Sequence, residues 1–410
     1  MIKPMKVKIS SFTPLFFPYT ARCVSFFSDV TFIQGFIPNS YTVKILKLFD
    51  FIFKSNITKR ASRRLPLNYK GVNIGISLPE IFLVLGISIF KNKSKVQLYS
   101  HILYGWCSKF YINKLDIFHV RSGSGRGGAI TKAKRIGGIV ITDHSIAHPK
   151  AMEAILLDEY KKYNIPFEFS NCFWDIIIKD CKEADYLLVN SDFVKDSFIK
   201  QGFDNRKIKV IYLGVREDFW GCKTQYEISD VLNLLFIGGF GFRKGAEYIL
   251  KSLDLIKKKG INFTLTIIGP IENFQQVIEK YNTEHINFKG RVIYDDLKKY
   301  YATSDIFLFP SLCEGSTMAG MEAMSAGMPC IFTDNCGVPV IDGENGLIIP
   351  IKDEQAIADA VEILYKNESI RREIGIKATQ TIRNKYKWSD YQNNLNNFYT
   401  DLLKNQMKKN

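Results

Sequence analysis

Residues 305–333 read DIFLFPSLCEGSTMAGMEAMSAGMPCIFT, and this stretch decides the fold that we expect. It opens with an apolar run at 306–309 that Pro310 closes, which is typical of a buried parallel strand. A short polar loop follows, and then a Met- and Ala-rich segment at 318–326 that a glycine ends, so we predict a helix there. Residues 330–333 are apolar again and predict a second strand.

Two glutamates, Glu314 and Glu322, flank the predicted strand-to-helix turn with seven residues between them. The first N–H groups of a helix have no partner within the helix, and the helix dipole adds partial positive charge, so this end attracts phosphate. The small residues Gly315, Ser316 and Thr317 let a diphosphate approach the backbone, and carboxylates accept hydrogen bonds from sugar hydroxyls. The spacing alone is equally consistent with a capped turn that carries two solvated glutamates.

Length and charge limit the classes of protein to consider. The chain has 410 residues, which suits two domains rather than one. Its net charge of +15 favours anionic partners such as nucleotides or phospholipid headgroups, although lysine is abundant throughout and offers a purely compositional explanation. We expect no nucleic-acid partner, because the sequence has no groove-reading motif and no platform of aromatic and basic residues.

The eight cysteines form no Cys-x-x-Cys pair and no Cys/His cluster with metal-ligand spacing. We therefore expect no metal site, and buried free thiols in a reducing compartment. The first ten residues, MIKPMKVKIS, lack the apolar region of a signal peptide.

The most apolar long stretch covers residues 74–90, and Pro79 and Glu80 interrupt it. Its unbroken part, 81–90, is far shorter than the ~20 residues that a membrane-spanning helix needs. We interpret this stretch as part of the hydrophobic core, and the basic loop at 59–64 as a solvated loop or one that meets an acidic surface.

From residue 116 onward, strand-like apolar runs alternate with amphipathic helix-like runs, which predicts parallel sheets covered by helices. The predicted strands are 116–121, 139–142, 186–190, 209–213, 233–237, 263–268, 286–288, 306–309, 330–333 and 347–349. The polar segment 221–230 separates the two halves. We expect an α/β protein with two doubly wound domains, 1–222 and 223–387, that face a central cleft where ligands of such sheets bind. A helix at 388–405 is expected to pack back on the first domain.

Several motifs occur in a fixed order along the two halves. They are ADYLLVNSDF at 184–193, KVIYLGV at 209–215, a glycine loop from Gly238 to Lys244-Gly245, Glu314-x7-Glu322, and GENGLIIP at 343–350. Together they resemble the GT-B glycosyltransferases, and among these the large retaining family 4. The resemblance covers about residues 116–386.

The resemblance implies roles for the donor side of the cleft. Glu314 would contact hydroxyls of the donor sugar near the reacting carbon, and Glu322 would hold the ribose. Lys244, with Arg243 beside it, would neutralise the diphosphate and stabilise the leaving group. The glycines Gly238 and Gly239 would form the phosphate loop.

Two further parts of the site follow from the same resemblance. Gly315, Ser316 and Thr317 would offer backbone N–H groups to the phosphates. His144, just beyond a predicted strand, resembles the family histidine that faces the donor sugar and the acceptor, and His148 is a near competitor.

The implied activity is that of a hexosyl- or glycosyltransferase (EC 2.4 type) in polysaccharide or glycolipid biosynthesis. It would move a sugar from a nucleotide-diphosphate donor to a hydroxyl of a glycan or lipid-linked acceptor, with retention of configuration. The nucleotide sugar is a substrate, and no metal or other cofactor is expected. We expect a cytoplasmic protein, at the inner face of the membrane through peripheral contact with anionic lipid.

Two other activities remain open at this point. One is a different GT-B activity such as nucleotide-sugar epimerisation, and the other is a catalytically inactive GT-B scaffold that binds nucleotide or a partner. The sequence departs from the family pattern in three places: Gly239 stands where an Arg is usual, Val340 stands where a Glu is frequent, and residues 12–19 contain no glycine loop.

Overall fold

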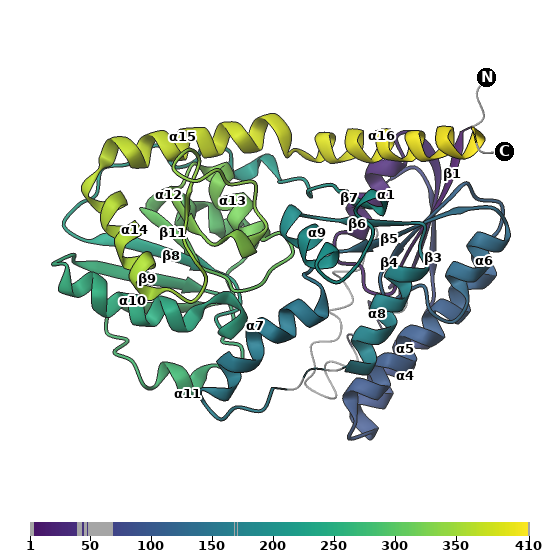
Figure 1. Cartoon of the computed structure of the whole chain (residues 1–410), viewed down its shortest axis with the longest axis horizontal. Helices are drawn as coiled ribbons and strands as arrows, with labels where there is room; N and C mark the ends of the chain where they lie inside the picture. Colours follow the sequence, from purple (N-terminus) through teal and green to yellow (C-terminus); the bar gives the residue numbers. More distant parts are fainter. Residues whose placement is uncertain are drawn as a thin grey trace.

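The computed structural model describes residues 4–38, 43–44, 47, 69–167, 169 and 171–408. The basic loop expected at 59–64 lies outside the described residues. Two α/β units lie side by side in the molecule (Figure 1), each built on a parallel sheet with helices on its faces, as the alternation predicted.

The first sheet has seven strands in the order β3-β2-β1-β4-β5-β6-β7 within the described residues, and every pairing is parallel. The strands are β1 (Met5–Ser11), β2 (Ser28–Gln34), β3 (Val72–Gly75), β4 (Ile117–Arg121), β5 (Ile139–His144), β6 (Tyr186–Val189) and β7 (Ile208–Val210). Every residue of β5 is buried, which is why this strand reads as a continuous apolar run in its first part.

The described helices of this unit are α1 (Phe17–Val24), α4 (Leu78–Ile89), α5 (Lys93–Ser108), α6 (Ala129–Arg135), α7 (Pro149–Lys161), α8 (Asn171–Glu183) and α9 (Asp192–Ile199). Side-chain caps fix the starts of α5, α7 and α9: Asn92 accepts a hydrogen bond from the Lys95 N–H, His148 accepts one from the Lys150 N–H, and Ser191 accepts one from the Val194 N–H.

The second sheet has the order β10-β9-β8-β11-β12-β13, again with parallel pairings. Its strands are β8 (Leu232–Ile237), β9 (Phe263–Ile268), β10 (Ile286–Gly290), β11 (Ile306–Phe309), β12 (Cys330–Phe332) and β13 (Leu347–Ile348). Its helices are α10 (Ala246–Lys258), α11 (Gln275–Ile278), α12 (Leu297–Thr303), α13 (Met318–Ala326), α14 (Glu354–Lys366) and α15 (Glu368–Lys385). The strand order reverses between β8 and β11, which makes the carboxyl edge at these two strands a topological switch point of the sheet.

The last helix, α16 (Trp388–Met407), returns to the first unit, and α15 and α16 run along the same side of the molecule (Figure 1). Its buried side chains Tyr391, Leu395 and Tyr399 belong to the core around β1 and β4. Buried hydrogen bonds fix it there: the Tyr391 hydroxyl lies 2.9 Å from Thr20 Oγ1, and the Tyr399 hydroxyl lies 2.6 Å from His119 Nδ1.

Helix α7 connects the two units. It follows β5 of the first sheet, but its side chains Met152 and Leu156 are buried in the core of the second unit. At its end, the buried Glu159 forms an ion pair with Lys352 at 2.7 Å and accepts a hydrogen bond from the Tyr248 hydroxyl at 2.8 Å. The position of α7 therefore depends on side chains from both halves of the chain.

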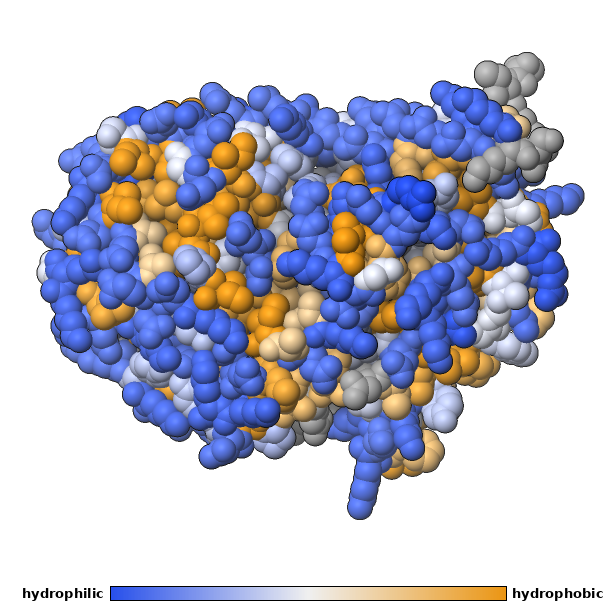
Figure 2. Space-filling model, in the orientation of Figure 1, coloured by the Kyte–Doolittle hydropathy of each residue, from blue (hydrophilic) through white to orange (hydrophobic). Residues whose placement is uncertain are grey.

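The interpretation of residues 74–90 as core holds for the first part, where Ile76 is buried and Ile74 packs beside it, and is wrong for most of α4. Leu83 packs inward and Gly86 lies against Val96 of α5, but most apolar side chains of α4 are exposed, including Leu85 at 55% and Ile89 at 70%. Helix α4 lies at the edge of the first unit (Figure 1), and Figure 2 shows apolar residues at that end of the molecule. Residues 78–89 do form a helix, but only a few of its side chains face the interior of the first unit.

The eight cysteines are free thiols, and five of them are buried, whereas Cys172 is exposed. The expectation of buried thiols therefore does not hold for every cysteine. Within the described part of the chain, no helix combines the length and the apolar composition that a membrane crossing requires.

Candidate functional site

The loops after β8 and β11 bring three charged side chains together at the point where the second sheet reverses. Lys244 Nζ lies 2.5 Å from Glu314 Oε1, and the Arg243 guanidinium forms an ion pair with the same oxygen. Arg243 also donates a hydrogen bond to the Cys313 carbonyl at 3.1 Å. Strands β8 and β11 are neighbours in the sheet, so residues about 70 positions apart in the chain meet at one edge.

Burial shapes the electrostatics of this group. Lys244 is 9% exposed, and its Nζ lies 4.6 Å from the centroid of the Phe309 ring. Burial lowers the pKa of Lys244, and Arg243 lowers it further, whereas Glu314 opposes the shift. Oε2 of Glu314 makes no hydrogen bond within the described part of the chain, so this oxygen is available to accept one from a ligand hydroxyl.

One departure from the family pattern lies in the glycine loop after β8. A Cβ added to Gly239 would lie 2.0 Å from Oε1 of Glu272, so the Glu272 carboxylate occupies the space that a side chain at position 239 would enter. The neighbouring Gly238 has a φ of +153° and donates its N–H to the Ile268 carbonyl at 2.8 Å. The guanidinium that contacts Glu314 comes instead from Arg243, four residues further on.

The start of α13 offers fewer amides than the resemblance implies. The Thr317 N–H is used in a hydrogen bond to the Cys336 carbonyl at 3.2 Å. The N–H groups of Gly315 and Ser316 have no hydrogen-bond acceptor among the described residues, and neither has the Ser316 hydroxyl. Two amides and one hydroxyl therefore remain for a phosphate group at this helix end.

Glu322 lies on α13, and two tyrosines hold its carboxylate. The Tyr294 hydroxyl donates to Oε1 at 2.7 Å, and the Tyr301 hydroxyl donates to Oε2 at 3.1 Å. Burial raises the pKa of Glu322, while the two hydrogen bonds oppose the shift. Sequence reasoning missed both tyrosines, because their spacing carries no motif and only the packing of α12 on α13 brings Tyr301 to this carboxylate.

His144 is the last residue of β5 rather than a loop residue, and it is 1% exposed. Its Nδ1 lies 2.9 Å from the Ser122 hydroxyl, and its Nε2 has no partner among the described residues. Burial, followed by the charges of Arg121 and His148, holds the pKa of His144 well below its usual range, so the ring is neutral at pH 7.

His148, the competitor of His144, has a structural task. Its Nδ1 accepts a hydrogen bond from the Lys150 N–H at 3.2 Å, so it caps the start of α7. Burial lowers the pKa of His148 to about 4, and Lys150 and Lys182 lower it as well.

The loop that carries Glu314 lies directly against loops of the first unit. A Cβ added to Gly315 would be 1.9 Å from the Ser145 carbonyl oxygen, so only glycine fits this approach. The Ser191 hydroxyl donates a hydrogen bond to the Gly315 carbonyl. The structure thus places the loops that follow β5 and β6 next to Glu314, and His144 immediately precedes Ser145.

A hollow of about 600 Å³ between the two units adjoins this contact. Its polar lining includes Asp192, Asp196, Asp334 and Asn335. The Asn335 carbonyl accepts a hydrogen bond from the Glu314 N–H at 3.0 Å, which connects the hollow to the charged group.

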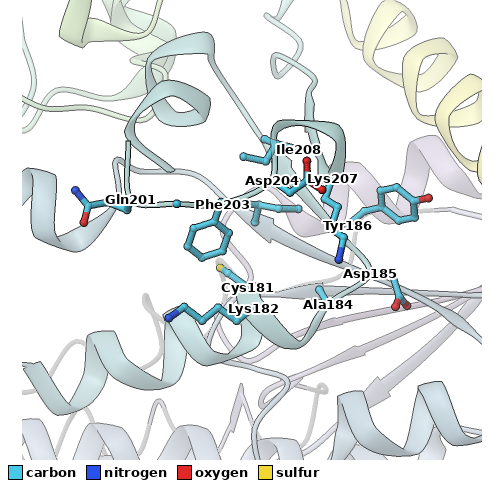
Figure 3. A pocket seen from close by; sticks show the side chains of 12 residues that line it. Cys181, Lys182, Ala184, Asp185, Tyr186, Gln201, Phe203, Asp204, Lys207 and Ile208 are labelled. Carbon is cyan, nitrogen blue, oxygen red and sulfur yellow. The ribbon is translucent and has the colours of Figure 1, made fainter. Parts of the chain in front are cut away.

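Another pocket lies elsewhere and is not part of this site. It has a volume of about 260 Å³, and its lining includes Cys181, Asp185, Phe203 and Lys207 (Figure 3). These residues surround the beginnings of β6 and β7, which is the edge of the sheet opposite to His144. In the described residues, no group of three or more His, Cys, Asp or Glu side chains is arranged to hold a metal ion.

Comparison with known proteins gives family matches for both units. Residues 78–219 match the model of Glycosyltransferase Family 4, and residues 224–381 match the model of glycosyl transferases group 1.

Two of the similar relatives act in bacterial polysaccharide biosynthesis by name. The capsular polysaccharide biosynthesis glycosyltransferase CapM of Staphylococcus aureus is 29% identical over 44% of this chain and 50% of its own length. The amylovoran biosynthesis glycosyltransferase AmsK of Erwinia amylovora is 27% identical over 46% of this chain and 49% of its own length. The chain thus spans about half the length of these relatives.

A solved structure shares the fold along nearly the whole chain. The structure of Anabaena Alr3699/HepE in complex with UDP and glucose has a TM-score of 0.62 and 14% identity, and the match covers 97% of this chain and 100% of that one.

Proposed function

The chain belongs to the family 4-like glycosyltransferases of the GT-B fold, and we propose that it moves a sugar from a nucleotide-diphosphate donor to a hydroxyl acceptor. The observation that carries this proposal is the contact of Lys244 and Arg243 with Glu314 where the second sheet reverses. Two fixed cations beside a carboxylate suit a ligand that is anionic at one end and rich in hydroxyls at the other.

The proposed reaction forms a bond between the acceptor oxygen and the anomeric carbon while the bond from that carbon to the diphosphate oxygen breaks. Negative charge develops on the diphosphate, and Lys244, Arg243 and the start of α13 stabilise it. Glu314 accepts hydrogen bonds from the sugar, and Glu322 holds the ribose. We propose that the acceptor attacks on the face that the diphosphate leaves and that its proton passes to the departing diphosphate, which retains the configuration.

We propose that these fixed cations take the role that a metal ion has in other nucleotide-sugar enzymes, so the reaction needs no metal or other cofactor. The support is the pair of cations held by a single carboxylate oxygen. Turnover that persists in excess EDTA is the expected result, and turnover that requires added Mg²⁺ or Mn²⁺ would contradict it.

The acceptor is proposed to be a glycan or a lipid-linked sugar, because CapM and AmsK are named for polysaccharide biosynthesis. HepE, whose structure holds UDP and glucose, supports a nucleotide-diphosphate donor. We also propose that the protein is cytoplasmic and contacts the inner face of an anionic membrane peripherally, in keeping with its net charge of +15.

A donor screen tests the activity. Release of nucleoside diphosphate is measured over a panel of nucleotide sugars, with Glu314→Ala as the test variant and Glu373→Ala, on an exposed turn of α15, as the control. We expect one donor to be turned over by the parent and by the control, and at least about 100-fold more slowly by Glu314→Ala. Binding of nucleotide without any turnover would favour the inactive scaffold, and interconversion of the donor sugar without an acceptor would favour an epimerase.

A further inference from the structure

Helix α4 presents an apolar surface that nothing in the described structure covers. The α4 surface consists of Leu78, Ile81, Phe82, Leu85, Ile89 and the following Phe90, each of which is at least 36% exposed. These side chains adjoin one another along one helix, unlike the singly scattered apolar residues that protein surfaces normally carry. A contiguous patch of this kind marks a surface that meets another apolar phase or molecule.

The α4 surface carries almost no charge. Residues 78–90 contain one ionisable side chain, Glu80, and its carboxylate accepts a hydrogen bond from the Phe36 N–H at 3.0 Å at the inner end of the helix. With 12 residues, α4 has a length of roughly 18 Å, less than the thickness of a bilayer core. Helix α4 is therefore suited to lie in the surface of a bilayer and is too short to cross it.

Positive charge lies beyond one end of this surface. Lys91, Lys93 and Lys95 follow α4 directly and are all exposed, and we call them the basic rim. Residues 91–135 contain ten Lys and Arg but a single acidic residue, Asp116. An apolar helix with lysines beside it is the combination that binds anionic lipid, because the helix enters the acyl region while the lysines stay at the headgroups.

Aromatic side chains complete the pattern at the end of α5. Trp106, Phe110 and Tyr111 are 46%, 64% and 41% exposed, and Lys109 Nζ lies 5.2 Å from the centroid of the Trp106 ring. Trp and Tyr favour the boundary between apolar and polar phases, since each has an apolar ring and a polar tip.

We propose that the α4 surface and its basic rim dock the protein on an anionic lipid surface. This inference rests on the proposed peripheral membrane contact and names the surface that makes it. A second copy of the chain is a poorer occupant, because residues 78–135 contain only two acidic residues, Glu80 and Asp116, to meet the basic rim of the other copy.

The docking position is connected to the candidate site by a short path. His101 of α5 lies 3.1 Å, through Nδ1, from the Gly123 carbonyl, and Gly123 follows Ser122, whose hydroxyl contacts His144. Docking through α4 would therefore hold the unit that carries His144 against the lipid.

The test is flotation of the full chain with phosphatidylcholine vesicles, with and without phosphatidylglycerol, at about 0.15 M salt. The double variant Ile81→Asn/Leu85→Asn is expected to lower the partition onto anionic vesicles at least about tenfold, since two inserted apolar side chains become polar. Replacement of the basic rim (Lys91→Gln/Lys93→Gln/Lys95→Gln) is expected to remove the difference between anionic and neutral vesicles. The matched control is Ile363→Asn/Ile376→Asn, two side chains of similar exposure on α14 and α15, which are expected to leave the partition unchanged.

A second readout uses the parent chain, so its result does not depend on whether the double variant folds correctly. Brominated phosphatidylglycerol is expected to quench Trp fluorescence, and Trp106→Phe is expected to lose most of that quenching. Partition of the double variant equal to that of the parent would overturn the proposal, and so would equal binding to neutral vesicles. A parent dimer that the double variant converts to monomer would overturn it in favour of a second copy.

Donor turnover and vesicle binding are measured independently, so the docking surface and the transferase activity can each be rejected without the other. Donor turnover without vesicles is expected to be the same in the parent and in the double variant. If no donor is turned over but the vesicle results hold, the docking surface stands and only the transferase proposal falls.

Discussion

Glu322 and Glu159 are both buried glutamates, and their surroundings shift their pKa values in opposite directions. Burial raises the pKa of Glu322, and the hydrogen bonds from Tyr294 and Tyr301 do not offset it. Burial also acts on Glu159, but the contacts with Lys352, Lys162 and Tyr248 outweigh it and lower the pKa. The direction of each pKa shift follows from the groups in contact with the carboxylate. Two lysines contact Glu159, whereas the hydrogen-bond donors to Glu322 are the neutral hydroxyls of two tyrosines.

The raised pKa of Glu322 predicts a gain of stability on neutralisation. A carboxyl group with a raised folded-state pKa contributes stability below its ordinary value of 4.5, and this contribution is lost as the pH rises through the folded-state pKa. We therefore expect Glu322→Gln to have a higher Tm than the parent at pH 7.5, and the difference to vanish below about pH 4.5.

The same variant is expected to bind the nucleotide at least about tenfold more weakly, because a charged acceptor to the ribose is lost. Thermal unfolding measured across pH checks the expected difference in Tm, and calorimetric titration with nucleotide checks the expected loss of affinity. A lower Tm at pH 7.5 would show that the hydrogen bonds to Tyr294 and Tyr301 depend on the charge.

Lys244 gives a second prediction at the scale of one residue. Lys244→Met keeps most of the side-chain volume over the Phe309 ring but removes the charge beside Glu314. We expect kcat for donor turnover to fall roughly 10²–10³-fold, with a smaller change in KM, since charge develops on the diphosphate in the transition state. The control is Lys377→Met, which loses only an exposed pair with Glu373 on α15. Equal kcat in both variants would remove Lys244 from the mechanism.

At the scale of elements, the sequence predicts most boundaries correctly. The expected strand at 306–309 and helix at 318–326 agree with β11 and α13, because full burial leaves a strand as an uninterrupted apolar run and glycine ends the helix. β5 extends two residues further than expected, through Asp143 and His144, since buried polar residues do not read as strand. Polar partners in the first sheet make this possible, as His119 Nε2 lies 3.3 Å from Asp143.

The role of α4 was not predictable, because an apolar sequence shows that a helix avoids water without showing whether protein or another phase covers it. The tyrosines around Glu322 were missed for a related reason. Their side chains reach the carboxylate from two separate elements, and no periodicity along one element encodes such a contact. By contrast, the resemblance to the GT-B family predicted that Lys244 and Glu314 share one site, and they meet because β8 and β11 are neighbours in the sheet.

The attachment of α16 gives a prediction for one element. Tyr399→Phe removes the hydroxyl that contacts His119 Nδ1 and leaves a buried ring nitrogen without its partner. We expect a loss of about 1–3 kcal/mol of unfolding free energy. Chemical denaturation measures it, and Tyr99→Phe on the exposed side of α5 is the control with no expected change. No loss in Tyr399→Phe would mean that apolar packing alone holds α16.

At the scale of the whole molecule, Glu159 joins the two units through Lys352 and Tyr248. Its lowered folded-state pKa means that its stabilising contribution is present above 4.5 and is lost as the pH falls through the folded-state value. We expect Glu159→Gln to cost roughly 1–3 kcal/mol at pH 7, because hydrogen bonds to a buried charged group are lost while Lys352, 29% exposed, stays hydrated, and to cost little at acidic pH.

A double-mutant cycle with Lys352→Met checks the origin of that cost. Coupling of the two substitutions is expected at pH 7 and not at acidic pH. Additive costs at pH 7 would show that the pair does not link the units. The control pair is Lys366 and Glu362, an exposed contact on α14 for which we expect coupling below about 1 kcal/mol.

The return of α16 to the first unit also bears on how the protein is made. The core around β1 and β4 includes Tyr391, Leu395 and Tyr399, so residues near both ends of the chain build it. During translation the strands of the first unit leave the ribosome early, yet their core stays incomplete until residues 388–407 emerge. The second unit, made later, has its own strands and helices complete before then. We therefore expect the first unit to complete its core after the second, and a chain that stops before residue 388 to leave the apolar surface around β1 and β4 exposed to water.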